Sequence, residues 1–323
     1  MMPRPANVSV VDPINAAIER VKHMLFRPFD LAKWMTIGFC AWLATLGEGG
    51  YGGNFNVPSS EHSGKSLHQE IEQAKAFVMS NLNWIIPLVV VMVIIGFVLG
   101  VLMLWLNSRG KFMFLHCVAL NVAEVKVPWN KFKTQGNSLF WFRFVLSLIG
   151  TVLTLPLVIM GCFPIYRMFT ARKLIMGDIQ ELILLFIVMM ALGCVFLVIV
   201  KFTADFVVPI MFLRGSKCLA AWRELFSLVS GNFGRFVLYF LFQLLLHLVI
   251  GIAVLLVLVF TCCLCIVGCC LLIIPYIGTV MLLPVLVFHR SYSLYYLRQY
   301  GDEFDVFEPT VPFTAVSSVQ AGN

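Results

Sequence analysis

One stretch of the chain constrains its fold more than any other. From Phe236 to Phe288 the only strongly polar side chains are Gln243 and His247. As one helix this stretch would be a rod about 80 Å long, whereas the hydrocarbon core of a bilayer is about 30 Å thick. We therefore predict two membrane-spanning helices here, joined by a tight turn near 261–268.

The composition of the whole chain extends this prediction. Of the 323 residues, 60% are hydrophobic and 12% are charged, whereas a soluble domain is about half apolar and about a quarter charged. A water-soluble core cannot bury so much apolar surface, so a bilayer has to solvate it. The net charge of +7 comes from short basic segments beside the apolar runs. This arrangement is typical of membrane topology and predicts no nucleic-acid partner.

Four further apolar runs precede this stretch, so we predict an all-α fold, a polytopic transmembrane helical bundle of about six spans. The first run is short and carries Lys33 near its start. The four runs extend from Asp30 to about Leu46, from Trp84 to Leu106, from Leu139 to about Phe163, and from Leu182 to Leu213. A glycine-rich loop at 47–53 and a helix at 67–78 are expected between the first two spans.

The lysine and arginine residues predict that both termini are cytoplasmic. These residues gather before the first span and after the second, fourth and sixth spans, and basic loops mark the cytoplasmic side. The cluster from Arg167 to Lys173 lies on the opposite side and is the one dissenting signal. The first twelve residues contain no apolar segment of a signal peptide, so we expect a multi-pass protein of a cell membrane with an uncleaved first span.

Two basic amphipathic segments, 13–26 and 215–230, are expected to lie on the cytoplasmic membrane surface. Apolar residues recur in the first at helical spacing, and Pro28 ends the pattern. Such segments suit an anionic leaflet, and ordinary topology charge is the alternative explanation. The candidate contacts to lipid headgroups are Arg20, Lys22, Arg223 and Arg235.

The chain also contains a threefold pattern of basic segment, span, outer loop and span. The even-numbered spans end alike, in Asn107-Ser108-Arg109, in Leu213-Arg214-Gly215 and in Phe288-His289-Arg290. We expect one membrane domain over 1–323, with repeat-like units at 12–106, 107–213 and 214–290 and a cytoplasmic tail at 291–323. Either duplication or convergence of helical hairpins explains this pattern.

Two polar pairs interrupt the apolar runs and form a candidate intramembrane site. Lys201 and Asp205 are four residues apart in the fourth span, and Gln243 and His247 have the same spacing in the fifth. Charged groups within a span indicate a functional site by default. The alternatives are a Lys201 that reaches the interface, a structural ion pair, and hydrogen bonds to a neighbouring helix.

Other motifs indicate packing. Gly96 and Gly100 form a GxxxG pattern, typical of close helix packing within a chain or between copies. The cysteine group from Cys262 to Cys270 lacks the ligand spacing of a zinc site, and no histidine or carboxylate lies beside it. The glycine-rich loop lacks the Gly-Lys-Ser/Thr of a P-loop. We therefore expect neither a metal nor another cofactor.

The stretch from Asp205 to Phe242 resembles a recurring segment of an uncharacterised family of bacterial six-span membrane proteins. That family is similar to the membrane domain attached to some glycerophosphodiester phosphodiesterases. The matching features are a span ending in Pro209, a basic turn, the Ala221-Trp222-Arg223 helix, Gly231-Asn232, and Phe236 at the start of a new span. The resemblance implies a protein of the bacterial inner membrane without established chemistry. No hydrophilic phosphodiesterase domain is recognised here, so no catalytic residues are carried over.

We consider three functions for a chain with these patterns. The favoured one is a non-enzymatic membrane module that organises lipid, including anionic lipid, or partner proteins, with a homo-oligomer as one arrangement. A transporter or permease for a small or lipidic substrate is the alternative, supported by the repeat and by Lys201 and Asp205. An enzyme is not expected, because no span carries a nucleophile and base, a ligand set or paired carboxylates.

Overall fold

The computed structural model describes residues 8–47, 79–171, 176–264 and 275–307, and all of its regular elements are helical. This confirms the all-α class. The α-helices are α1 Asp12–Val21, α2 Leu31–Thr45, α4 Leu82–Leu120, α5 Lys126–Lys131, α6 Lys133–Ala171, α7 Met176–Phe202, α8 Val208–Arg214, α9 Cys218–Leu264, α11 Pro275–Met281 and α12 Leu283–Arg298. Two π-helical turns, η1 Lys22–Phe26 and η2 Thr203–Val207, and one 3-10 turn, η3 Asp302–Phe304, complete the described elements.

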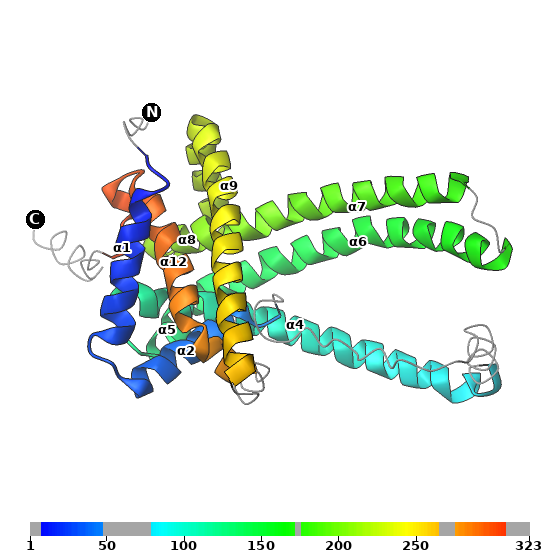
Figure 1. Cartoon of the computed structure of the whole chain (residues 1–323), viewed down its shortest axis with the longest axis horizontal. Helices are drawn as coiled ribbons and strands as arrows, with labels where there is room; N and C mark the ends of the chain where they lie inside the picture. The colour runs from blue at the N-terminus through cyan, green and yellow to red at the C-terminus, as the bar shows by residue number, and fades with distance from the viewer. Residues whose placement is uncertain (1–7, 48–78, 172–175, 265–274, 308–323) are drawn as a thin grey trace, which may run out of the picture.

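Figure 1 shows a compact body from which long helices extend. α1, α2, α5, α8 and α12 gather in this body with the C-terminal end of α4, and α6 and α7 extend from it side by side. Four segments of the described chain are long and apolar enough to cross a membrane: Leu82–Leu120, Lys133–Arg167, Met176–Arg214 and Cys218–Val257. These four segments are compatible with a membrane protein, and six spans remain a prediction.

The helix of the first predicted span, α2, is shorter than the hydrocarbon core of a bilayer. α2 has 15 residues, which gives a length of about 22 Å against a hydrocarbon core of about 30 Å. Asp30 caps its start, because the side chain accepts hydrogen bonds from the backbone N–H groups of Ala32 at 2.9 Å and Lys33 at 3.3 Å. The predicted helix at 67–78 lies outside the described residues. So does the second half of the predicted turn at 261–268, whereas its first half belongs to α9, which extends to Leu264.

α4 extends well beyond Leu106, where the second span was predicted to end. The helix continues unbroken to Leu120, and every residue from Asn107 to Ala119 is buried in the body. It ends at Asn121, whose φ of 57° is the left-handed conformation common at helix C-termini. The apolar residues of this stretch are covered by other helices, which explains why it is helical and packed although it carries several cations.

The three segments that end alike in the sequence meet in the body. The C-terminal part of α4, the η2–α8 segment and α12 all contact one another. An aromatic cluster joins η2 and α12 to α9: the ring of Tyr239 lies 4.4 Å from that of Tyr296 and 4.9 Å from that of Phe206. Tyr292 and Tyr296 are fully buried, so the predicted tail boundary at 290 does not coincide with a structural break.

The crossing of α2 and α4 is unusually close because of one glycine. A Cβ atom at Gly110 would lie 2.5 Å from the carbonyl carbon of Leu43 and 2.6 Å from the backbone nitrogen of Ala44. No side chain fits in that space without a backbone shift. Gly110 therefore fixes the distance between these two helices and anchors α2 to the body.

Candidate functional site

The predicted pair in the fourth span forms an ion pair. Lys201 Nζ lies 3.2 Å from Asp205 Oδ2, with side-chain exposures of 28% and 11%. Asp205 lies within the π-turn η2, and π-turns inside long helices are frequent at functional sites. The exposures place Asp205 within the buried body and Lys201 at its edge.

The second predicted pair joins the first through a residue that sequence reasoning missed. The Tyr239 hydroxyl donates to Asp205 Oδ2 at 3.1 Å, and Gln243 Nε2 donates to the Tyr239 oxygen at 3.0 Å. His247 Nδ1 lies 2.7 Å from the backbone oxygen of Gln243. One polar network therefore runs from η2 along α9. The i, i+4, i+8 spacing of Tyr239, Gln243 and His247 was a usable signal in the sequence.

The direction of these hydrogen bonds leaves one acceptor open. Because Tyr239 gives its hydrogen to the carboxylate, its oxygen can only accept, so the Gln243 amide must present its NH₂ group to it. Gln243 Oε1 is then buried without a partner among the described residues. A cavity of about 280 Å³ adjoins it, with Lys201 and His247 as the other polar lining residues. The cavity has room for water that could satisfy this acceptor.

α12 contributes two further polar residues that the sequence did not single out. The His289 ring stacks on that of His247, with centroids 4.1 Å apart. Arg290 Nη1 donates to the backbone oxygen of Ala204 at 2.5 Å, whereas its Nε and Nη2 atoms have no partner among the described residues. Through this hydrogen bond Arg290 joins α12 to η2.

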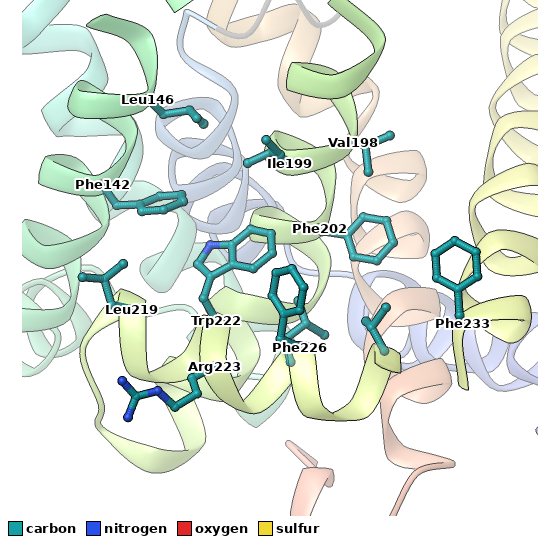
Figure 2. Close-up of a pocket in the computed structure, with 12 residues that line it drawn as sticks. Phe142, Leu146, Val198, Ile199, Phe202, Leu219, Trp222, Arg223, Phe226 and Phe233 are labelled. Carbon is teal, nitrogen blue, oxygen red and sulfur yellow. The ribbon is translucent and has the colours of Figure 1, made fainter. Parts of the chain in front are cut away.

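A second feature is an apolar groove of about 810 Å³ between α6, α7 and α9. Figure 2 shows its aromatic and aliphatic lining. Phe142 and Leu146 come from α6, and Val198, Ile199 and Phe202 from α7. The remaining lining residues come from the first part of α9, which includes most of the predicted amphipathic segment 215–230. They are Leu219, Trp222, Arg223, Leu225, Phe226, Val229 and Phe233.

The two faces of this part of α9 differ in what covers them. Ala221 and Leu225 are buried in the body. Leu219, Phe226 and Phe233 are 73%, 66% and 68% exposed, although they line the groove. Side chains of this size are rarely left to water in such a group, so the groove indicates an apolar ligand or the bilayer.

The polar groups of the groove are few. Arg223 carries the one charge among its lining residues, and Figure 2 shows its guanidinium pointing away from the apolar side chains. No acidic partner of Arg223 occurs within the described part of the chain. The indole Nε1 of Trp222 is buried and has no hydrogen-bond partner there.

Arg20, one of the predicted headgroup contacts, makes its hydrogen bonds within the body. Its Nη2 atom donates to the backbone oxygens of Val118 and Ala119, both at 2.7 Å. These carbonyls end α4, where a cation is favourable. Burial lowers the pKa of Arg20, which agrees with a structural cation in the body.

The other predicted headgroup contacts lie in different surroundings. Lys22 is exposed and pairs with Glu19 at 2.8 Å. Arg223 is exposed at the groove, and Arg235 is half-buried, with its backbone oxygen accepting from the Tyr296 hydroxyl at 3.0 Å. Of the four candidates, Arg223 therefore combines exposure with a neighbouring apolar groove.

The GxxxG pattern and the cysteine group are the remaining predicted motifs. A Cβ atom at Gly96 or Gly100 would meet nothing within 4 Å among the described residues, so packing between copies is the alternative that stays open for this face. Groups of three or more histidine, cysteine or acidic residues that could hold a metal are absent from the described ranges. Cys265, Cys269 and Cys270 lie outside those ranges, so the prediction for the cysteine group stays untested.

Comparison with known proteins gives one match. The model of a family of unknown function (DUF7544) matches residues 8–281. No curated protein matches the chain, and no solved structure matches it. The family match does not extend to the membrane domains of glycerophosphodiester phosphodiesterases, so that part of the resemblance stays an expectation. Since the match covers most of the chain, including the polar network along α9 and the groove, the protein belongs to the DUF7544 family.

Proposed function

We propose that this protein is a non-enzymatic module of the membrane that organises lipid or partner proteins. The observation that carries the proposal is the uncovered apolar surface of the long helices. The most apolar stretches of α4, α6 and α7 contain no buried residue, and that of α9 contains almost none. Lipid or another protein has to cover this surface, because the described part of the chain does not.

The composition of these helices favours a module over a channel. From Trp84 to Leu106 α4 is apolar on every side, and from Leu182 to Val200 α7 is too. A helix that lines an aqueous path carries a polar face, whereas a helix that is apolar all round faces lipid or protein. The apolar α4 and α7 surfaces therefore support contact with lipid or partner proteins.

We infer the topology of the module from two features. The position of the basic segments concerns the side of the termini, and the contact between α2 and α11 concerns the number of spans. The basic segments gather in the body, which supports cytoplasmic termini and a bacterial inner-membrane location. α2 and α11 are adjacent, with the Tyr276 hydroxyl donating to the backbone oxygen of Met35 at 3.0 Å. This pairing supports α2 and the α11–α12 segment as a further two spans, for a total of six.

Three finer proposals concern the internal repeat, the family resemblance and the oligomeric state. The contacts among the α4 end, η2–α8 and α12 support a threefold internal repeat, because the three segments with similar sequences occupy adjacent positions. The similarity to the membrane domain of glycerophosphodiester phosphodiesterases rests on the sequence from Asp205 to Phe242, which supplies the carboxylate of the ion pair and most of the groove residues. A homo-oligomer through the open face of Gly96 and Gly100 is the favoured protein contact.

The lipids and proteins around the molecule test this function. Native membranes would be cut into polymer-bounded discs, and the discs that contain the protein would be isolated and their lipids and proteins quantified. A module of this kind enriches a lipid class or a second protein relative to discs from the same membrane. Discs with the bulk lipid composition and no second protein, including no second copy, would contradict the proposal.

Transport is the second candidate function, because the polar network lies beside a cavity. Lys201, Gln243 and His247 line that cavity, and Asp205 links Lys201 to the rest of the network. Asp205→Asn with unchanged protein levels would cause a growth or uptake defect if the network carries a solute. Normal growth and uptake would remove the support for transport.

A further inference from the structure

We propose that the groove between α6, α7 and α9 binds one anionic glycerophospholipid. Its phosphate lies at Arg223, and one acyl chain lies among Phe142, Leu146, Val198 and Phe226. This inference rests on the proposed function, since it names the lipid class and the place where the module would hold it.

The apolar lining suits an acyl chain. The groove volume of about 810 Å³ is within the range of about 300 to 1,000 Å³ typical of small-molecule sites. Eleven of the twelve lining residues are apolar or aromatic, and Arg223 is the exception. An extended hydrocarbon chain covers the exposed faces of Leu219, Phe226 and Phe233 without burying a polar group.

Selectivity has to come from the polar end of the lipid. Within a bilayer an acyl chain leaves surroundings that are already apolar, so its transfer to the groove changes the free energy little. A phosphate at the rim differs, because a guanidinium binds phosphate through paired, charge-assisted hydrogen bonds. The lining contributes a positive charge and no acidic residue, which favours an anionic headgroup.

The neighbouring charges leave Arg223 available. The acidic residue next to it, Glu224, pairs with Arg214 at 3.1 Å, and Arg214 also lies 3.6 Å from Glu303. Arg223 is exposed and has no carboxylate partner within the described ranges. Among the residues that line the groove, it is therefore the cation that an added phosphate can neutralise.

Trp222 provides a second, independent indication. Its indole Nε1 is a hydrogen-bond donor that is buried without a partner among the described residues, and Figure 2 shows it on the side of the ring toward Phe142. A buried tryptophan normally donates this hydrogen bond. An ester carbonyl next to the lipid phosphate supplies an acceptor at the depth where tryptophan is enriched in membrane proteins.

Photo-crosslinking of a defined lipid tests the assignment. The full-length protein would be reconstituted in phosphatidylcholine vesicles containing a small fraction of phosphatidylglycerol with a photoreactive acyl chain. Crosslinked peptides would then be mapped by mass spectrometry. We expect crosslinks on the α6 and α9 residues of the groove, and competition by unlabelled phosphatidylglycerol but not by added phosphatidylcholine.

Matched variants separate the headgroup from the groove. Arg223→Gln lowers groove labelling about fivefold, since one interfacial cation is worth about this factor in binding. Arg223→Lys keeps the charge but loses the paired hydrogen bonds, so it retains part of the labelling. Trp222→Phe gives a smaller loss, of about twofold to threefold. Lys217→Gln is the control, because Lys217 is an exposed cation just before α9 that does not line the groove, and it leaves labelling unchanged.

Three results would overturn the inference. Equal groove labelling by photoreactive phosphatidylcholine shows bulk lipid rather than a selective site. Labelling that is the same in Arg223→Gln and in the native protein shows that the headgroup is not recognised there. Labelling only on the outer surfaces of α4 and α7 shows that the groove holds another occupant, such as a partner helix. If native discs still enrich a lipid or protein in these cases, the groove assignment alone fails and the module stands.

Discussion

The Tyr239 hydroxyl donates a hydrogen bond to Asp205 Oδ2 over 3.1 Å and so ties α9 to the π-turn η2. The same carboxylate oxygen lies 3.2 Å from Lys201 Nζ. Asp205 is therefore the residue on which the polar network depends, and truncation of its side chain leaves both a cation and a hydroxyl without their acceptor.

Asp205→Ala should destabilise the protein by about 1–3 kcal/mol, because it removes the acceptor of a partly buried ion pair and of a buried hydroxyl. The partial exposure of Lys201 keeps the effect below that of a fully buried pair. Thermal unfolding of the protein in detergent measures the loss. Adding Lys201→Met to Asp205→Ala should recover part of it, and additive losses from the two changes would show that the ion pair is not coupled.

Gly110→Ala should destabilise the protein by about 1–3 kcal/mol or more, because the new methyl group meets backbone atoms of Leu43 and Ala44. The matched control is Gly96→Ala in the same helix, where a Cβ meets nothing among the described residues. Unfolding temperatures of the two variants compare the sites directly. Equal effects would contradict the close crossing of α2 and α4, and a changed oligomeric state in Gly96→Ala alone would support packing between copies at that face.

Arg20→Met should lower stability by about 1–2 kcal/mol, because the last carbonyls of α4 lose their cationic hydrogen-bond donor. Arg20→Lys should keep part of the effect through its charge. Selective labelling by phosphatidylglycerol in the groove should be unchanged in both variants, as measured by the same photo-crosslinking. A loss of lipid selectivity at full stability would restore Arg20 as a headgroup contact.

The pairing of α2 with α11 predicts a specific disulfide. A Cβ atom at Gly38 would lie 3.4 Å from Cβ of Val280, close to the separation of about 3.8 Å found in disulfides. In a background without other cysteines, Gly38→Cys with Val280→Cys should therefore crosslink under mild oxidation. A protease site inserted at 265–274 would reveal the bond, since the two fragments stay together until reduction. Fragments that separate without reduction would argue against the adjacency of α2 and α11.

The long apolar helices could be predicted from the sequence because their signal is local. The run from Leu182 to Leu213 becomes part of α7, η2 and α8, and the chain turns at Gly215 as the basic residues after it suggested. The ion pair of Lys201 and Asp205 was predictable for the same reason, since four residues along a helix bring two side chains together. Spacing within one helix is sufficient for all of these features.

The body could not be predicted in this way, because its contacts join residues far apart in the chain. Arg20 has the spacing and charge of an interfacial residue, and nothing near it in the sequence shows that the end of α4 lies beside it. His289 and Arg290 looked like the end of a span, whereas α12 places them against His247 and Ala204. Helical periodicity shows that a face is apolar or polar but not which helix covers it.

The most direct test is the solvent access of position 205. Asp205→Cys, in a background without other reactive cysteines, would be treated with a polar thiol reagent from each side of the membrane. A module whose network is packed within the body predicts no labelling from either side, since the Asp205 side chain is 11% exposed before any lipid is added. Labelling through a water path, blocked by an added solute, would contradict the module and establish a transport or binding cavity in its place.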